Sequence, residues 1–261
     1  MTFKRISLTA TMVLLAFCST ALAHDMWGTA EKPEAGKLLT AVIGYGHNFP
    51  QWEAIPDDEV DLFKPVRVIG PKGDLTMKPG ADNYKAVSQE ALVKGTYLVI
   101  ADVKPVFWTK TPDGWSQKPR SEEPQALSCG LYIENAKGIV NVDGAAETGL
   151  IAKPVGLPLE IVSLANPATV KPGQRLQLKV LFEGKPLAGA KVEGRFAGFA
   201  QEASDSAKAF ADTTGKDGVV NFVPLKSGDW IVTVRNVRPY PEAGKCDNED
   251  FGTSLFFTIN D

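Results

Sequence analysis

The sequence contains two histidines, His24 and His47, and both are candidate ligands for a transition metal. His24 directly follows Ala23, and cleavage of the chain after Ala23 would make His24 the first residue. A terminal histidine offers its α-amine and its ring Nδ1 to the same ion, and a second imidazole supplies a third nitrogen. Amine and imidazole nitrogens suit Ni, Cu and Zn better than Mg or Ca. Asp25 is the nearest additional oxygen donor, so the predicted metal site is His24, His47 and Asp25.

The first 23 residues have the layout of a secretory signal peptide. Lys4 and Arg5 give a basic start, and the apolar stretch at 8–17 is too short to span a bilayer. Ala21-Leu22-Ala23 is a small-x-small cleavage site. We therefore expect a signal peptide at residues 1–23, a mature chain that begins at His24, and a periplasmic location.

The three cysteines fit an exported protein. Cys18 would leave with the signal peptide, and the alternative of a lipid anchor at Cys18 is disfavoured by the bulky Phe17 before it. Cys129 and Cys246 remain, and a single pair in an oxidising compartment predicts a disulfide. A two-thiolate metal site is the alternative, and it is disfavoured because free thiols do not persist well outside the cytoplasm.

Composition narrows the class of function. Removing 23 residues from 261 leaves 238 and changes the formal net charge from 28 − 31 = −3 to 26 − 31 = −5. A mildly acidic exported chain has no electrostatic reason to bind nucleic acid or anionic lipid. No segment of the mature chain approaches transmembrane length, so we expect no membrane span. The sequence lacks a Gly-rich phosphate loop and a nucleophile elbow, which favours a binding protein over an enzyme.

Strand signals dominate the mature chain, and no long stretch has helical periodicity. Runs of β-branched, aromatic and alternating apolar residues are separated by turns rich in Pro and Gly. The expected strands include 38–45, 97–101, 131–133, 176–182, 231–234 and 255–259. Residues 105–124 carry two tryptophans, several prolines and several charges, and they are predicted to form a surface loop. The predicted fold class is all-β.

A weak internal similarity suggests two related units. Residues 94–99 resemble residues 227–232, since in both a Gly turn leads an aromatic residue into a β-branched strand. Short, evenly spaced strands favour two tandem β-sandwich (Ig-like) domains. Pro and Gly cluster at 153–158, so we expect an N-terminal domain with the metal site at 24–155. The C-terminal domain at 156–261 is then of Ig-like size, about 100 residues.

Two further features are weaker candidates for a binding site. Trp27, Phe49 and Trp52 flank the histidines and could stack on a sugar, although aromatic residues near strand ends are more often part of the core. The acidic run 247–250 lacks the spacing and the glycine of a calcium loop. We expect that run to be a solvated loop beside Cys246.

Several segments resemble the NikM-like nickel-uptake domain family, whose members are often described only as domains of unknown function. The segments are Ala23–Trp27, Gly46-His47, Cys129–Tyr132 with Ala136-Lys137, and above all 156–192. The resemblance implies a periplasmic β-sandwich associated with nickel or cobalt uptake, often as an accessory to an energy-coupling-factor type importer. It also implies a terminal histidine as metal ligand, a position that His24 matches, while His47 matches a histidine after the first long strand. This sequence lacks the C-terminal membrane helix of some members.

The sequence therefore predicts a non-enzymatic periplasmic protein that captures Ni(II) or Co(II) and supports its uptake by an importer at the inner membrane. A copper chaperone is one alternative, because nitrogen-rich sites bind Cu(II) more tightly than Ni(II). A structural or carbohydrate-binding pair of Ig-like domains is a second alternative, since tandem sandwiches serve many roles. An oxidative copper enzyme with a terminal histidine is a third, for which only scattered tryptophans offer a substrate surface.

Overall fold

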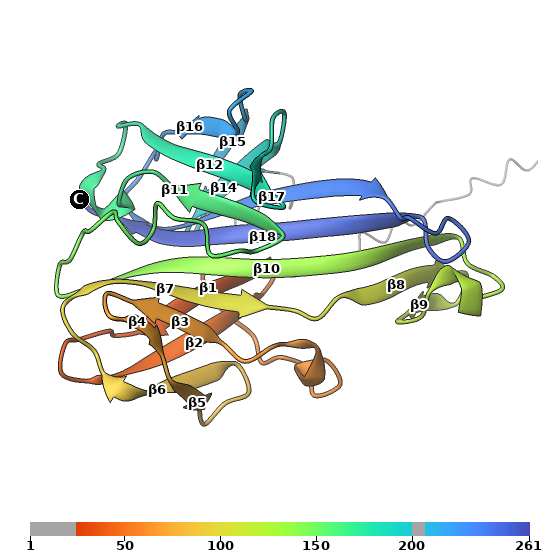
Figure 1. The fold of residues 1–261 in the computed structure, drawn as a ribbon, viewed down its shortest axis with the longest axis horizontal. Coiled ribbons are helices and arrows are strands. Elements are labelled where there is room, and N and C mark those ends of the chain that lie inside the picture. The colour runs from red at the N-terminus through yellow and green to blue at the C-terminus, as the bar shows by residue number, and fades with distance from the viewer. Residues whose placement is uncertain (1–24, 200–206) are drawn as a thin grey trace, which may run out of the picture.

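The computed structural model describes residues 25–199 and 207–261, and these residues form an almost entirely β structure (Figure 1). The prediction of an all-β chain is confirmed. Each expected strand lies within an observed one. The strands are β1 (Asp25–Glu31), β2 (Leu38–Gly46), β3 (Arg67–Gly70), β4 (Gly73–Leu75), β5 (Met77–Pro79), β6 (Lys85–Ala91), β7 (Gly95–Asp102), β8 (Val106–Thr111), β9 (Gly114–Ser116), β10 (Ser128–Val142), β11 (Leu159–Ser163), β12 (Leu176–Phe182), β13 (Lys185–Pro186), β14 (Lys191–Phe196), β15 (Phe210–Thr213), β16 (Val219–Phe222), β17 (Gly228–Pro239) and β18 (Asn248–Ile259). Short 3-10 turns lie at η1 (Val60–Leu62), η2 (Arg120–Glu122) and η3 (Pro167–Thr169).

The strands form three stacked layers. The central sheet has the order β15-β14-β17-β18-β10-β7-β3-β4, with β8 and β9 attached beside β10. An N-terminal sheet, β1-β2-β6-β5, packs on one face, and a C-terminal sheet of β11, β12, β13 and β16 packs on the other. Successive side chains of a strand point to opposite faces. Leu98 and Ile100 of β7 therefore enter one hydrophobic core, whereas Tyr97 and Val99 enter the other.

The two halves of the chain share the central sheet, which differs from two separate tandem sandwiches. Strand β10 from the first half pairs in parallel with β18 from the second, from Gly130 opposite Asn248 to Gly138 opposite Phe256. The predicted boundary at 155/156 falls in the connection between β10 and β11. Pairing these two long strands removes two open sheet edges, which would otherwise be exposed to association with other chains.

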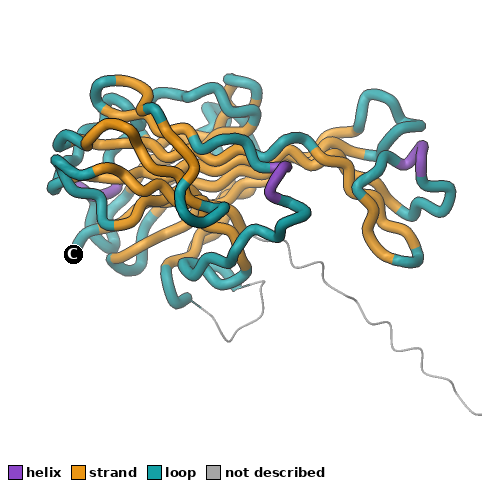
Figure 2. The backbone as a smooth tube through the Cα atoms, turned by 90° about the horizontal axis from the view of Figure 1, so that it is seen from below, coloured by secondary structure: helices purple, strands orange, loops and turns teal. Residues whose placement is uncertain are grey.

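An arm extends from the layered body (Figure 2). It consists of the β8–β9 hairpin, the start of β10, and the strands β17 and β18 where they meet at Pro239 and Asn248. The prediction of a surface loop at 105–124 was therefore wrong, because much of that segment pairs as strands. The hairpin turns at Pro112-Asp113, between the paired residues Thr111 and Gly114, and Pro and Asp are common turn residues.

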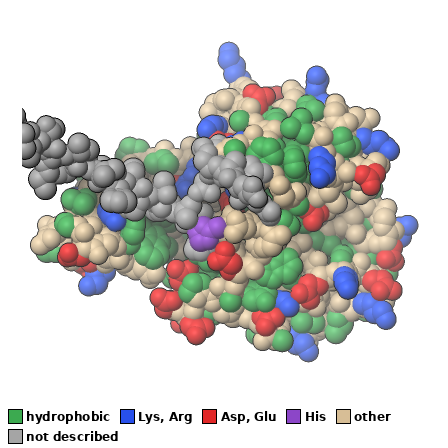
Figure 3. Space-filling view, turned by 180° about the vertical axis from the view of Figure 1, so that it is seen from behind, with side chains coloured by type: hydrophobic (Ala, Val, Ile, Leu, Met, Phe, Trp, Pro, Cys, Tyr) green, Lys and Arg blue, Asp and Glu red, His purple; other side chains and the backbone are tan. Residues whose placement is uncertain are grey.

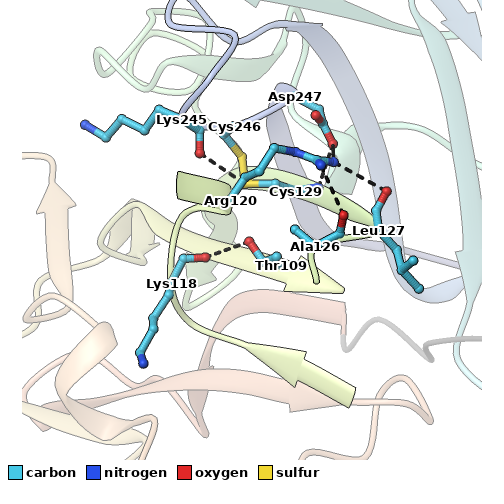
Figure 4. Close-up of a disulfide and its surroundings, with 9 residues drawn as sticks. All are labelled: Thr109, Lys118, Arg120, Ala126, Leu127, Cys129, Lys245, Cys246 and Asp247. Carbon is cyan, nitrogen blue, oxygen red and sulfur yellow. Dashed lines mark hydrogen bonds and ion pairs between the residues drawn. A yellow bond between two sulfur atoms is a disulfide. The ribbon is translucent and has the colours of Figure 1, made fainter. Parts of the chain in front are cut away.

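The predicted disulfide between Cys129 and Cys246 is present and ties the two sides of the arm together (Figure 4). The Asp247 carboxylate accepts hydrogen bonds from the Arg120 guanidinium and from the Cys129 N–H, each at 2.7 Å. These two donors, Arg120 first, lower the pKa of Asp247 against a smaller opposing effect of burial. The expectation of a solvated loop at 247–250 was also wrong, since residues 248–250 begin β18.

Strand β1 crosses the central sheet at close range because glycines face each other there. A Cβ on Gly138 would lie 1.8 Å from the Gly28 carbonyl oxygen. We expect Gly138→Ala to lower the free energy of unfolding by about 1–3 kcal/mol, because neither backbone has room to move aside. Urea denaturation measures the change, and Gly149→Ala, where the added methyl meets open space, is the control. Equal stability of the two variants would contradict this packing argument.

Candidate metal site

The pairing of β1 with β2 brings the predicted site residues toward one end of a ladder. Asp25 lies opposite Gly46 and Trp27 lies opposite Gly44 in an antiparallel register. His47 follows Gly46 directly, so Asp25 and His47 lie at the same end of the pair. The register depends on Gly44, because a Cβ there would lie 1.9 Å from the Trp27 indole.

The turn that carries His47 is anchored in the core. Phe49 is buried and packs edge-to-face against Trp27 and Phe256, with ring centroids 5.2 and 6.1 Å apart. The backbone N–H of Glu53 donates to the Tyr45 carbonyl at 2.7 Å, which closes the turn. The fixed turn holds the His47 backbone in one place at the end of β2.

The His47 side chain lies at the surface beside a carboxylate. Its Nδ1 is 3.4 Å from Oε1 of Glu53, and the His47 backbone N–H donates to the same oxygen at 3.2 Å. The imidazole is 30% exposed, and Figure 3 shows the histidine at the surface with acidic side chains next to it. Sequence reasoning missed Glu53, which is six residues beyond His47 and becomes its neighbour only because the turn folds back.

Asp25 forms an ion pair with Arg195 of β14, and both side chains are about four-fifths buried. This contact joins the start of β1 to a strand from the second half of the chain. The Asp25 carboxylate therefore already has the Arg195 guanidinium as its partner, and this ion pair competes with binding of a metal by Asp25. Arg195 could not be predicted as a partner from local patterns, because it lies 170 residues from Asp25 and meets it only through the fold of the sheets.

Several acidic side chains lie near the His47 turn. The Tyr45 hydroxyl donates to Glu59 at 2.9 Å, and burial, followed by Glu59, raises the pKa of Tyr45. The charges of Glu134 and Glu53 act in the same direction. Burial also raises the pKa of Glu134, against the opposing charge of Arg235. Glu53 and Glu59 add negative charge beside the turn, whereas Glu134 is buried near the Arg235 guanidinium.

Within residues 25–199 and 207–261, no three His, Cys, Asp or Glu side chains gather in a way that could hold a metal ion. The predicted ligand His24 and the predicted signal peptide lie outside the described residues. The pairing of His24 with His47 therefore stays a prediction.

The aromatic residues near His47 have two different surroundings. Trp27 and Phe49 are buried and belong to a small core with Ile231 and Phe256. Their faces are therefore closed to a sugar ring, whereas Trp52 is exposed. The Trp27 Nε1 is buried and has no hydrogen-bond partner among residues 25–199 and 207–261.

The helical content of the described chain is confined to short 3-10 turns. Among the described residues, none of these helical segments has the length and apolar character needed to cross a bilayer.

The fold and the site define an all-β protein of stacked sheets with a histidine turn at one end of its first strand pair. The chain matches, over residues 21–238, a family described as a domain of unknown function, DUF4198, and it belongs to that family. No curated protein matches it.

Three solved structures show weak similarity to this chain. The D0-D1 domain of intimin is 16% identical, with 89% of this chain and 97% of that chain covered and a TM-score of 0.21. The FN1-FN3 domains of chicken CNTN1 are 9% identical, with 90% and 66% covered and a TM-score of 0.21. The domains MG0-NIE-MG1 of alpha-2-macroglobulin from Escherichia coli are 9% identical, with 92% and 73% covered and a TM-score of 0.22.

Proposed function

We propose that this protein is a periplasmic metal-binding protein that captures Ni(II) or Co(II) through its mature N-terminal histidine, His24, together with His47. The observation that carries the proposal is the pairing of Asp25 with Gly46. His24 precedes Asp25 and His47 follows Gly46, so each histidine is the next residue along the chain from this pair. Neighbouring Cα atoms of a chain are about 3.8 Å apart, which limits how far each histidine lies from that pair.

The donor set suits a transition metal that is bound and then released. His24 supplies an amine and an imidazole nitrogen, and His47 supplies a third nitrogen, which favours Ni, Co or Cu over Mg or Ca. The carboxylate of Glu53, whose Oε1 lies 3.4 Å from His47 Nδ1, favours the approach of a cation. Water is the better candidate for the remaining positions than Asp25, because Arg195 already pairs with that carboxylate. An open position is typical of sites that exchange ligands.

Two further parts of the proposal come from the sequence. The signal peptide at 1–23 supports a periplasmic location. The resemblance to the NikM-like nickel-uptake domain family supports a nickel or cobalt importer at the inner membrane as partner. Membership of a family of unknown function is compatible with that resemblance.

Isothermal titration of the mature protein with Ni(II) tests the proposal. We expect one tight site, and we expect His24→Ala to weaken it by more than roughly tenfold, or about 1.4 kcal/mol. A variant with one extra glycine before His24 keeps both imidazoles but converts the α-amine into an amide, and it is expected to lose affinity to a similar extent. Asp57→Ala, a carboxylate change in an exposed part of the following loop, is the control and is expected to bind as wild type.

Two results would overturn the proposal: no binding of Ni(II) by the wild type, or binding that neither His24→Ala nor the added glycine changes. A purely structural or carbohydrate-binding module predicts that blocking the terminus with an added residue changes nothing. Cu(II) is expected to compete successfully in vitro whatever the cargo. Metal analysis of the protein purified from the periplasm therefore identifies the ion.

A further inference from the structure

We propose that Glu53 is a positioning residue that fixes the ring tautomer of His47 and leaves Nε2 as its metal-binding nitrogen. This inference rests on the proposed function for the identity of the ligand. It goes beyond that function because it assigns a role to a residue outside the ligand set. It also specifies which of the two ring nitrogens faces the ion.

One carboxylate oxygen faces two nitrogens of the same residue. Oε1 of Glu53 accepts the His47 backbone N–H at 3.2 Å and lies 3.4 Å from His47 Nδ1. An ionised carboxylate only accepts hydrogen bonds, so a neutral imidazole facing it carries its proton on Nδ1. The lone pair then lies on Nε2. In metal sites the second ring nitrogen of a ligating histidine typically donates to a carboxylate, a carbonyl or water, and that contact orients the ring.

The backbone of the turn places Glu53 beside His47, and the Glu53 side chain is 49% exposed. The Glu53 N–H donates to the Tyr45 carbonyl at 2.7 Å, so the Glu53 backbone is bound to the end of β2, the strand that precedes His47. The carboxylate lies against Gly46, where an added Cβ would be 3.1 Å from Oε1. Phe49 anchors the intervening chain in the core. Both partners are therefore held by the same short, anchored turn before any ion arrives.

Nitrogen-15 NMR of the metal-free mature protein tests the tautomer directly. The sequence has two histidines, so His24→Ala assigns the ring signals of His47. At mildly alkaline pH we expect the wild type to show a proton on Nδ1 of His47. Glu53→Ala is expected to shift the population toward the Nε2–H form. Glu53→Gln retains an acceptor oxygen and is expected to keep the wild-type tautomer, and Asp57→Ala serves as the control.

Titration with Ni(II) provides the second measurement. We expect Glu53→Ala to weaken binding by roughly 10–100-fold, the usual effect of removing an outer-shell partner, and Glu53→Gln to weaken it less. A proton on Nε2 in the metal-free wild type would overturn the inference. So would a Glu53→Ala variant with the wild-type tautomer, whatever its affinity, because Glu53 would then act as a direct ligand or not at all. Failure of the wild type to bind Ni(II) would instead overturn the proposed function, since the metal-free spectra do not depend on the ion.

Discussion

Replacing Lys137 with methionine is expected to lower the free energy of unfolding by about 3–5 kcal/mol. Lys137 is 2% exposed, and its Nζ lies 2.6 Å from Oε1 of Glu160, which is 1% exposed. The substitution would leave the Glu160 carboxylate buried without its cation. An unpaired buried charge costs far more than the pair itself contributes, and this asymmetry gives the expected size of the effect.

The Lys137–Glu160 pair also anchors the connection between β10 and β11, which joins the two halves of the chain. Glu160 also accepts the backbone N–H groups of Val155, Gly156 and Leu157, at distances from 2.9 to 3.3 Å. These residues lead from the central sheet into β11 of the C-terminal sheet. Burial lowers the pKa of Lys137, and the Glu160 carboxylate opposes that effect. The buried carboxylate of Glu160 thus binds both Lys137 and the backbone of the connection between the two sheets.

A double-mutant cycle separates the pair from its surroundings. Urea denaturation of Lys137→Met, Glu160→Gln and the double variant should show a double variant that is less destabilised than the sum of the singles, because no lone charge remains. Lys191→Met is the control, because its partner is Glu193 and its side chain is 72% exposed. Lys191→Met is expected to lower the free energy of unfolding by less than about 1 kcal/mol. Additive single effects, or a Lys137→Met variant as stable as the control, would contradict the prediction.

Local sequence patterns predicted the strands well because alternation of apolar residues is a local property. Residues 176–182 match β12 in full, and the apolar run at 38–45 lies within β2. The disulfide was also predictable, since only two cysteines follow the predicted signal peptide. The pairing of β10 with β18 could not be predicted, because nothing in the sequence of either strand specifies a parallel partner more than a hundred residues away.

In the candidate site, too, residue types could be read from the sequence, whereas contacts between distant residues could not. The two histidines and Asp25 were recognisable by residue type. The contact between Asp25 and Arg195 required the central sheet, and the contact between His47 and Glu53 required the fold of one turn. A carboxylate six residues after a histidine would lie about 20 Å from it along a strand and about 9 Å along a helix. Only a closed turn such as the one between Tyr45 and Glu53 makes them neighbours.

Removing the disulfide with Cys129→Ser and Cys246→Ser is expected to lower the free energy of unfolding by up to about 4–5 kcal/mol. The two cysteines are 117 residues apart in sequence, and the chain-entropy model gives a large effect for so long a loop. The measured loss depends on whether the arm unfolds together with the body. Urea denaturation of the double variant, with unmodified protein as reference, measures the global effect.

Limited proteolysis shows which part of the protein is destabilised when the disulfide is removed. The arm is also held by the Asp247 carboxylate, which binds Arg120 and the Cys129 N–H. Because the pKa of Asp247 is lowered, that contribution is complete above the ordinary pKa of an aspartate and is lost as the pH falls through the lowered value. We therefore expect the serine variant to be cleaved in 105–127 first, and faster at acidic pH.

Arg120→Ala in the disulfide-intact protein is the matched control, because it removes the ion pair and keeps the covalent link. Both side chains of that pair are about one-third exposed, so its loss is expected to cost about 1 kcal/mol or less. Cleavage of the serine variant in the body before the arm would contradict the assignment of the disulfide to the arm. So would equal destabilisation by the two changes, because the long β10–β18 ladder would then hold the arm without help from the covalent link.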